Sequence, residues 1–456
     1  MLKRWDSPNG YRDVFAISLP MVASMGSLTL MHFTDRVFLA NYSVDTIAAS
    51  MPAGIASFAL VSFFLGVAGY TNTFVAQYTG SGAYNRLGAA LWQAVYFSLA
   101  SGVLLGIAAA LAGPLFDLVG HPPEVRKLEI VYFQILTLGS IFLLLEWTLA
   151  CFYSGRGLTR TVMAVNAVGA ALNIPLDYAL INGVWGFPEM GIAGAGIATV
   201  AGQALMFLLY VRLIFTQKHD AAFGVWRNRS FDGKLFLRLM KFGIPKGIQF
   251  FMDVFAFTFF VFMIGRLGTV ELAATNIVFA INTLAFMPMI GFSIGVSTLV
   301  GQAIGARKPE AGEEAATSTI HITTAYMAFV ALLFLLIPET LLRPFVSGGR
   351  DQAEMSTLVR LGVALLRFVA LYCVLDAMNL VYAGALQGAG DTRFVMEASA
   401  VLSLGVMIIP VFICIRFLDA GLYAAWAFAT AYAFALALIF WWRYRQGQWK
   451  QMRVIE

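Results

Sequence analysis

The chain has 456 residues, of which 60% are hydrophobic and only 12% are charged. Soluble domains are roughly 25% charged, so this composition excludes both a soluble globular protein and a disordered chain. A membrane-spanning helix needs about 20 apolar residues, and the length therefore allows about twelve crossings and no large soluble domain. The three cysteines all fall inside apolar runs, which argues against a disulfide framework or a metal cluster.

Long apolar runs between polar breaks predict twelve membrane-spanning helices. The runs are continuous rather than alternating, which disfavours a β-barrel. In chain order they cover 13–40, 52–79, 89–112, 128–153, 161–181, 191–215, 242–265, 276–303, 316–337, 358–385, 394–416 and 421–442. The first residues are charged and contain no cleavable apolar core, so we expect an uncleaved inner-membrane protein rather than a secreted one.

The distribution of basic residues predicts the orientation of the chain. With both termini in the cytoplasm, the cytoplasmic segments hold roughly three times as many Lys and Arg residues as the outer segments, counted from Lys3 to Arg453. We therefore expect a multi-pass protein of the inner membrane with both termini cytoplasmic. The net charge of +5 is explained by this topology, and a nucleic-acid partner is not expected.

The longest predicted cytoplasmic segment divides the chain into an N-lobe (1–215), a linker (216–241) and a C-lobe (242–456). Each lobe contains six predicted spans, and short segments of the first half recur in the second in the same order. The matching pairs are VDTIAAS and VELAATN, FVAQYTG and TLVGQAIG, and SGRGLTRTVM and QGAGDTRFVM. Because six is even, the two halves share one orientation and form parallel repeats.

Four polar residues of the N-lobe fall at a similar predicted depth, in the outer half of the membrane. They are Asp35, Asn173, Asp177 and Thr199, and Pro175 frees a backbone carbonyl next to them. Carboxylate, amide, hydroxyl and carbonyl oxygens suit a hard cation such as Na⁺, and two close carboxylates in low dielectric can instead hold a proton. The alternative is a set of buried hydrogen bonds that only ties three helices together.

The other acids that lie well inside predicted spans are Asp253, Asp376 and Glu146. Gln249 lies four residues before Asp253, and Tyr372 four residues before Asp376, so each acid has a polar neighbour on its helix face. Ionisable residues at this depth are costly, and two such carboxylates would attract organic cations. Helix-packing contacts are the alternative for this pair, and for Glu146 substrate contact and a helix–helix hydrogen bond remain equally open.

Several motifs are missing from the sequence. There is no phosphate-binding G-x-x-x-x-G-K-[ST] loop, so ATP is not the expected energy source, and no H-E-x-x-H or G-x-S-x-G motif suggests a hydrolase. We therefore expect a transporter rather than an enzyme, with no catalytic residues, no resident cofactor and no metal other than a coupling Na⁺.

The chain resembles the multidrug and toxic compound extrusion (MATE) family, in particular its bacterial NorM/DinF branch. The resemblance covers nearly the whole chain and is carried by the segments FTDRVFLA, SGRGLTRTVM, ALNIPLDYALI, WGFPEMGIAGAGIATV, GIPKGIQFFMDVFAF, LVGQAIGA and LYCVLDAMNLVYAGALQGAGDTRFVM. It implies an all-α polytopic membrane protein with twelve transmembrane helices in two six-helix lobes. It also implies antiport, in which entering Na⁺ or H⁺ drives export of hydrophobic, mostly cationic compounds. We expect it to act as a monomer.

By position, the resemblance places the N-lobe cation site at Asp35, Asn173, Asp177 and Thr199, and a C-lobe site at Asp253, Tyr372 and Asp376. From their places in the spans, Gln249 and Glu146 are candidates for further substrate contacts. NorM-type members carry a Glu where this chain has Asp253, which shifts the carboxylate by about one methylene. The alternative on the same fold is a flippase or exporter of a lipid-linked or anionic metabolite. It would need a strongly basic central cavity, and Lys246 and Arg367 are the in-span cations that offer one.

Overall fold

The computed structural model describes residues 4–117, 121–346 and 352–456. Within these residues all regular structure is helical, and twelve helical spans are long and apolar enough to cross a membrane. They are Tyr11–Tyr42, Val44–Gly80, Tyr84–Ala110, Pro123–Ser154, Thr159–Asn182, Ile192–Ile214, Gly233–Gly265, Thr269–Gly305, Pro309–Leu336, Met355–Ala389, Thr392–Phe417 and Leu422–Arg445. Each predicted span corresponds to one of them, which confirms the twelve-helix architecture. Lys3 and Arg350, which entered the predicted charge asymmetry, lie outside the described residues.

Several helices extend beyond the predicted spans, because hydropathy ends at the first charged turn whereas backbone hydrogen bonding continues. Helix α10 (Gly233–Gly265) is an example. It begins where Asp232 caps its first turn, with Oδ1 accepting hydrogen bonds of 3.1 Å from the backbone N–H groups of Lys234 and Leu235. The basic turn that follows was predicted to belong to the linker.

The described chain separates into two compact units, which we call the N unit and the C unit. The N unit comprises Leu19–Phe251, Gly301–Arg307 and Arg453–Glu456, and the C unit comprises Met1–Ser18, Met252–Val300 and Lys308–Met452. The division runs through three helices, namely α1 (Tyr11–Tyr42), α10 and α11 (Thr269–Gly305). Each unit therefore contains segments from both halves of the sequence.

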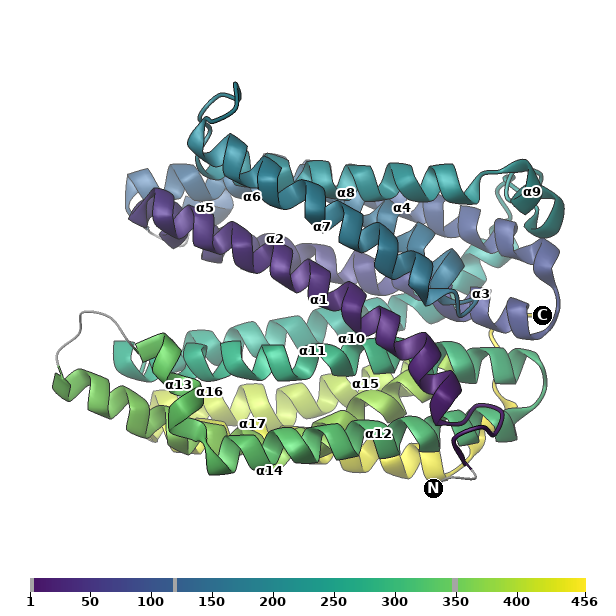
Figure 1. The fold of residues 1–456 in the computed structure, drawn as a ribbon. Coiled ribbons are helices and arrows are strands. Elements are labelled where there is room, and N and C mark those ends of the chain that lie inside the picture. The colour runs from purple at the N-terminus through teal and green to yellow at the C-terminus, as the bar shows by residue number, and fades with distance from the viewer. Residues whose placement is uncertain (1–3, 118–120, 347–351) are drawn as a thin grey trace. The chain divides into compact units, whose positions relative to one another are not determined.

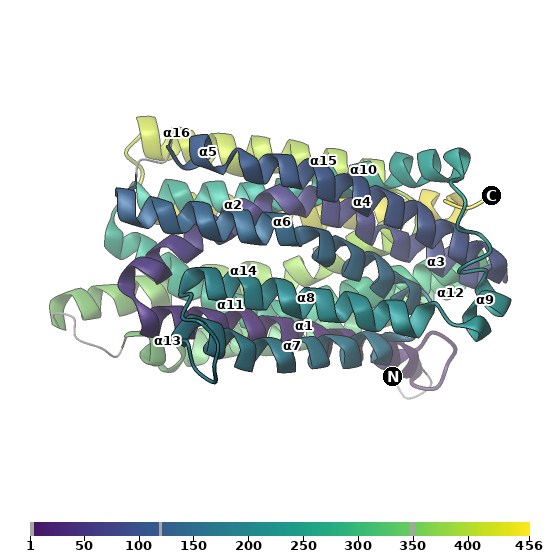
Figure 2. The same ribbon diagram turned by 90° about the horizontal axis from the view of Figure 1, so that it is seen from above.

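In the N unit, α6 (Pro123–Ser154) is the central helix. Helices α2 (Val44–Gly69), α4 (Leu87–Ala110) and α8 (Ile192–Ile214) pack against it, and α7 (Thr159–Asn182) packs against α8 (Figure 2). The shorter elements of the unit are α3 (Thr71–Gly80), η2 (Tyr84–Arg86), α5 (Ala112–Asp117) and α9 (Gln217–Phe223). Close packing around α6 is possible because small residues lie at the contacts, as at Gly139 of α6, where an added Cβ would overlap the Val200 side chain of α8.

Two glycines mark a very close helix crossing within the N unit. A Cβ atom added to Gly80 in α3 would lie 1.9 Å from the backbone oxygen of Gln302, at the end of α11. The contact is reciprocal, because a Cβ added to Gly305 would lie 2.1 Å from the backbone oxygen of Gln77. These four residues are the ones that the repeated segments FVAQYTG and TLVGQAIG align, so equivalent positions of the two halves meet here.

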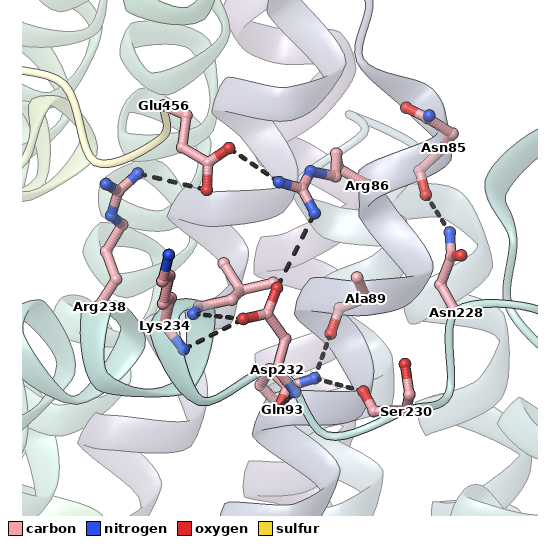
Figure 3. Close-up of polar contacts among 11 residues, drawn as sticks. Asn85, Arg86, Ala89, Gln93, Asn228, Ser230, Asp232, Lys234, Arg238 and Glu456 are labelled. Atoms are coloured by element: carbon pink, nitrogen blue, oxygen red, sulfur yellow. Dashed lines mark hydrogen bonds and ion pairs between the residues drawn. The ribbon is translucent and has the colours of Figure 1, made fainter.

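Residues 453–456 are anchored in the N unit beside this crossing. The Val454 N–H donates a 2.9 Å hydrogen bond to Oε1 of the buried Gln77. The Glu456 carboxylate lies between Arg86, at 2.8 Å, and Arg238, at 4.0 Å, and Arg86 also lies 3.9 Å from Asp232 (Figure 3). This polar cluster connects the end of the described chain to the start of α4 and the start of α10.

In the C unit, α14 (Gln352–Ala389) packs against α12 (Pro309–Leu336) and against α17 (Leu422–Arg445) (Figure 1). Shorter elements are α13 (Pro338–Val346) and η4 (Gln448–Gln451). The eleventh span is divided into α15 (Thr392–Leu402), a π-helical turn (Ser403–Ile408) and α16 (Ile409–Phe417). Pro410 in the first turn of α16 lacks a backbone N–H, which accounts for the wider turn before it.

Candidate functional site

The four polar residues that were predicted to form a cation site in the N-lobe all lie in the N unit, and all are buried. Asp35 is in α1, Asn173 and Asp177 are in α7, and Thr199 is in α8, and none is more than 6% exposed. The Asp35 and Asp177 carboxyl groups interact directly with each other. Helices α7 and α8 approach closely one turn from Thr199, where a Cβ added to Gly202 would lie 3.3 Å from the Asn173 Cβ.

Tyr132 of α6 completes this group. Its hydroxyl donates a 3.2 Å hydrogen bond to Oδ2 of Asp35, and its ring packs in an apolar cluster with Leu39, Phe116 and Phe133. The sequence did not single out Tyr132, because one tyrosine in an apolar helix is usually a packing residue. Only its distance from Asp35 in the folded unit distinguishes it from the other tyrosines.

Most oxygens of the acid pair have no hydrogen-bond donor. Within the described residues, Asp35 Oδ1, both Asp177 oxygens and both polar atoms of Asn173 are enclosed without a hydrogen-bond partner. Buried polar atoms are normally satisfied, and two ionised carboxylates have no donor to offer each other. The arrangement is therefore chemically suited to a cation or a proton shared by the two acids.

Pro175 lies between Asn173 and Asp177 inside α7. Because proline has no backbone N–H, the carbonyl of Ala171 loses its usual helical donor. A carbonyl oxygen on the turn that carries Asn173 is a further ligand of the kind that hard cations prefer.

The candidate residues of the second site, Asp253 in α10 and Tyr372 and Asp376 in α14, all lie in the C unit and are half-buried. The Asn379 side chain donates a 3.3 Å hydrogen bond to Asp376 Oδ1. Tyr432 of α17 lies close enough to interact with both Asp253 and Asp376, so these two acids belong to one region of the unit. The sequence did not indicate Tyr432, since α17 contains several aromatic residues without a distinguishing pattern.

The two further substrate-contact candidates, Glu146 and Gln249, lie in the N unit. Glu146 is buried in α6, near Tyr210 and Cys151. Gln249 is half-buried in α10 and accepts a 3.1 Å hydrogen bond from Lys246 Nζ. Lys246 was also a candidate for lining a basic cavity, and its ammonium group interacts with this neutral side chain.

Comparison with known proteins gives two matches of one family model along the chain. The model, described as MatE, matches residues 20–179 and 245–413. The matched segments begin at Pro20 and Pro245 and fall in the two halves that the repeated segments defined.

Curated relatives cover most of the chain. The multidrug resistance protein NorM of Photobacterium profundum is 28% identical, over 84% of this chain and 82% of its own length. The probable multidrug resistance protein NorM of Pseudomonas putida is 30% identical, over 82% of this chain and 81% of its own. The multidrug resistance protein PmpM of Pseudomonas aeruginosa is 28% identical, over 84% and 80% respectively.

Solved structures share the fold. An outward-facing multidrug resistance MATE family transporter of the MOP superfamily aligns with a TM-score of 0.88 over 99% of both chains, at 19% identity. A MOP superfamily transporter from Pyrococcus furiosus, described as having a binding pocket of reverse polarity, aligns with a TM-score of 0.87 over 97% of both chains, at 20% identity. With the family match extending over most of the sequence in two copies, the chain is a multi-pass membrane protein that belongs to the MatE family.

Proposed function

We propose that the protein is a cation-coupled antiporter of the inner membrane, with both termini cytoplasmic, that exports hydrophobic, mostly cationic compounds. The observation that carries this proposal is the buried Asp35–Asp177 pair with its unpartnered oxygens. The names of the curated relatives, which are multidrug resistance proteins, support the export of drugs. The protein acts as a monomer without enzymatic activity or a resident cofactor, and Na⁺ or H⁺ is a transported substrate.

The coupling follows from charge. A cation or proton at Asp35 and Asp177 removes the repulsion between two enclosed carboxylates, so it stabilises the conformation in which the two groups are close. Loss of that ion stabilises a conformation in which the acids separate or reach water. Two conformations with different affinities for the ion and the drug are sufficient for exchange.

The region around Asp253, Tyr372 and Asp376 is proposed to bind the organic cation in the C unit. Two half-buried carboxylates attract a cation, and the rings of Tyr372 and Tyr432 provide apolar contact and a π face. Asp253 is shorter than the Glu expected from the family resemblance, so this side of the site accommodates a bulkier cation.

The test is export of a fluorescent organic cation from proteoliposomes with pH and Na⁺ gradients imposed separately. Wild-type protein responds to at least one gradient, and Asp35→Asn and Asp177→Asn abolish the response without loss of folded protein. Asp45→Asn is the matched control, because Asp45 is an exposed acid in the first turn of α2. Wild-type-like transport by both Asp35→Asn and Asp177→Asn would rule out the mechanism proposed for the N unit.

The flippase alternative would need a strongly basic central cavity. The C unit has an open surface depression of about 770 Å³ that is lined by Arg360 and Arg367 together with Glu339, so it is neither enclosed nor exclusively basic. If the protein responds to neither gradient but moves an anionic lipid analogue, and Arg367→Gln stops that movement, the flippase reading replaces the antiporter.

A further inference from the structure

Glu129 is a buried acid that the proposed coupling site does not use. It lies near the start of α6, and its side chain has no exposed surface. One carboxylate oxygen, Oε1, is 2.7 Å from Nδ1 of His121, whose side chain is 38% exposed. The other oxygen, Oε2, is enclosed and has no hydrogen-bond partner among the described residues. One oxygen of this carboxylate therefore meets a half-exposed histidine, and the other is enclosed without a partner among the described residues.

Glu129 lies one helical turn from Tyr132, a residue that contacts the acid pair. Glu129 and Tyr132 are three residues apart on α6, so they lie on the same helix face one turn apart. Tyr132 donates to Asp35, and Asp35 interacts with Asp177. Apolar residues, including Phe116 and Phe133, pack around Tyr132. Glu129, Tyr132 and Asp35 are therefore polar residues within a mostly apolar region of the unit.

The other charged groups on the neighbouring elements leave Glu129 available. Arg126, one turn before Glu129, is paired at 2.5 Å with Asp117 of α5. Asp45 in the first turn of α2 is exposed. His121 is the basic residue that contacts the Glu129 carboxylate in the described structure.

We propose that Glu129 is a relay site for the coupling cation, placed between His121 at the protein surface and the Asp35–Asp177 pair. The inference rests on the proposed cation coupling and extends it to the route of entry. A carboxylate with one uncommitted oxygen can accept Na⁺ or H⁺ and pass it inward. In the proton case, the proton that Glu129 accepts is the one that the acid pair finally holds, and Tyr132 ends the step with its hydroxyl intact.

A relay residue and a structural residue differ in kinetics. In proteoliposomes, Glu129→Gln is expected to raise the half-saturating concentration of the coupling ion on the order of tenfold, because a full negative charge leaves the route. The maximal rate and the melting temperature stay close to wild type. Glu129→Asp keeps the charge and is expected to restore most of the ion affinity. Glu124→Gln, an exposed charge change in the first turn of the same helix, is the matched control and leaves the half-saturating concentration unchanged.

The inference is overturned if Glu129→Gln saturates at the wild-type ion concentration, or if it and Glu124→Gln shift the curve equally. If Glu129→Gln does not fold, His121→Gln decides the matter, since it removes the surface end of the relay while Glu129 stays in place. A severalfold increase in the half-saturating concentration supports the relay, and an unchanged value refutes it. Failure of the proposed function would be recognised separately: the wild-type protein would export no cation under either gradient, or the Asp35→Asn variant would still show gradient-driven export.

Discussion

The close backbone approaches at Gly80 and Gly305, to Gln302 and Gln77 respectively, predict how strongly alanine at either glycine lowers stability. An alanine Cβ at Gly80 would lie 1.9 Å from a backbone oxygen, whereas ordinary van der Waals contact begins at 3.4 Å. The two segments would have to separate by about 1.5 Å. The atoms in the way are the backbone oxygens of Gln302 and Gln77, which cannot move aside as the end of a flexible side chain would. Overpacking of this kind costs about 1–3 kcal/mol, more than the gain of up to about 1 kcal/mol in helix propensity.

Thermal unfolding of purified protein in detergent measures this effect. For a cooperative unit of this size, the cost corresponds to a melting temperature lowered by roughly 2–6 °C in Gly80→Ala and in Gly305→Ala. Gly26→Ala is the matched control, because Gly26 is a helical glycine of α1 with nothing within 4 Å of an added Cβ. That variant should melt at or slightly above the wild-type temperature.

The double variant sharpens the test. Both glycines lie at one helix crossing, so the separation forced by the first alanine already makes room for the second. The loss of stability in the double variant should therefore be smaller than the sum of the losses in the two single variants. The reasoning would be refuted by a Gly80→Ala protein as stable as Gly26→Ala. Full additivity in the double variant would show that the two contacts are independent.

Two further predictions concern ion pairs and capping. Asp391 pairs with Arg443 at 2.6 Å, and both side chains are largely buried, so Asp391→Ala should lower the free energy of unfolding by about 3 kcal/mol. Arg393 belongs to an exposed ion pair, so Arg393→Ala should change the free energy of unfolding by less than about 1 kcal/mol. Equal losses in the two variants would contradict the argument. Hydrogen bonds from the backbone N–H groups of Trp226 and Arg227 lower the pKa of Asp220. The ionised Asp220 side chain therefore stabilises the loop after α9 fully at a pH above the ordinary Asp pKa of about 4, and this stabilisation is lost as the pH falls through the lowered pKa. Protection of the Trp226 amide from hydrogen exchange should follow this curve, and Asp220→Asn should show low protection at every pH.

The number of spans and the positions of the principal acids could be predicted from the sequence, because burial in lipid requires long apolar runs and makes each interior charge conspicuous. Asp35 and Asp177 illustrate this, since helix spacing placed them at a similar depth and the family resemblance placed them in one site. The roles proposed for the four N-unit residues remain predictions.

Other features depend on contacts between segments distant in sequence. Tyr132 acquires its significance only through Asp35, almost a hundred residues away. Glu129 lies one residue inside a predicted span, where hydropathy cannot distinguish a surface charge from an enclosed one. Val454 is anchored to Gln77 by a hydrogen bond between residues more than three hundred positions apart. No local sequence pattern predicts this contact.

The division of three helices between the two units has a mechanical consequence. A rotation of one unit cannot be absorbed by slack loops where α1, α10 and α11 pass from one unit to the other, so the helices themselves must bend there. In α1 the boundary after Ser18 lies beside Pro20, where a backbone hydrogen bond is already missing and bending is least costly. Pro245 and Pro288 lie well away from the corresponding points in α10 and α11. We therefore expect α10 and α11 to resist bending at the boundary between the units, and α1 to bend there more easily.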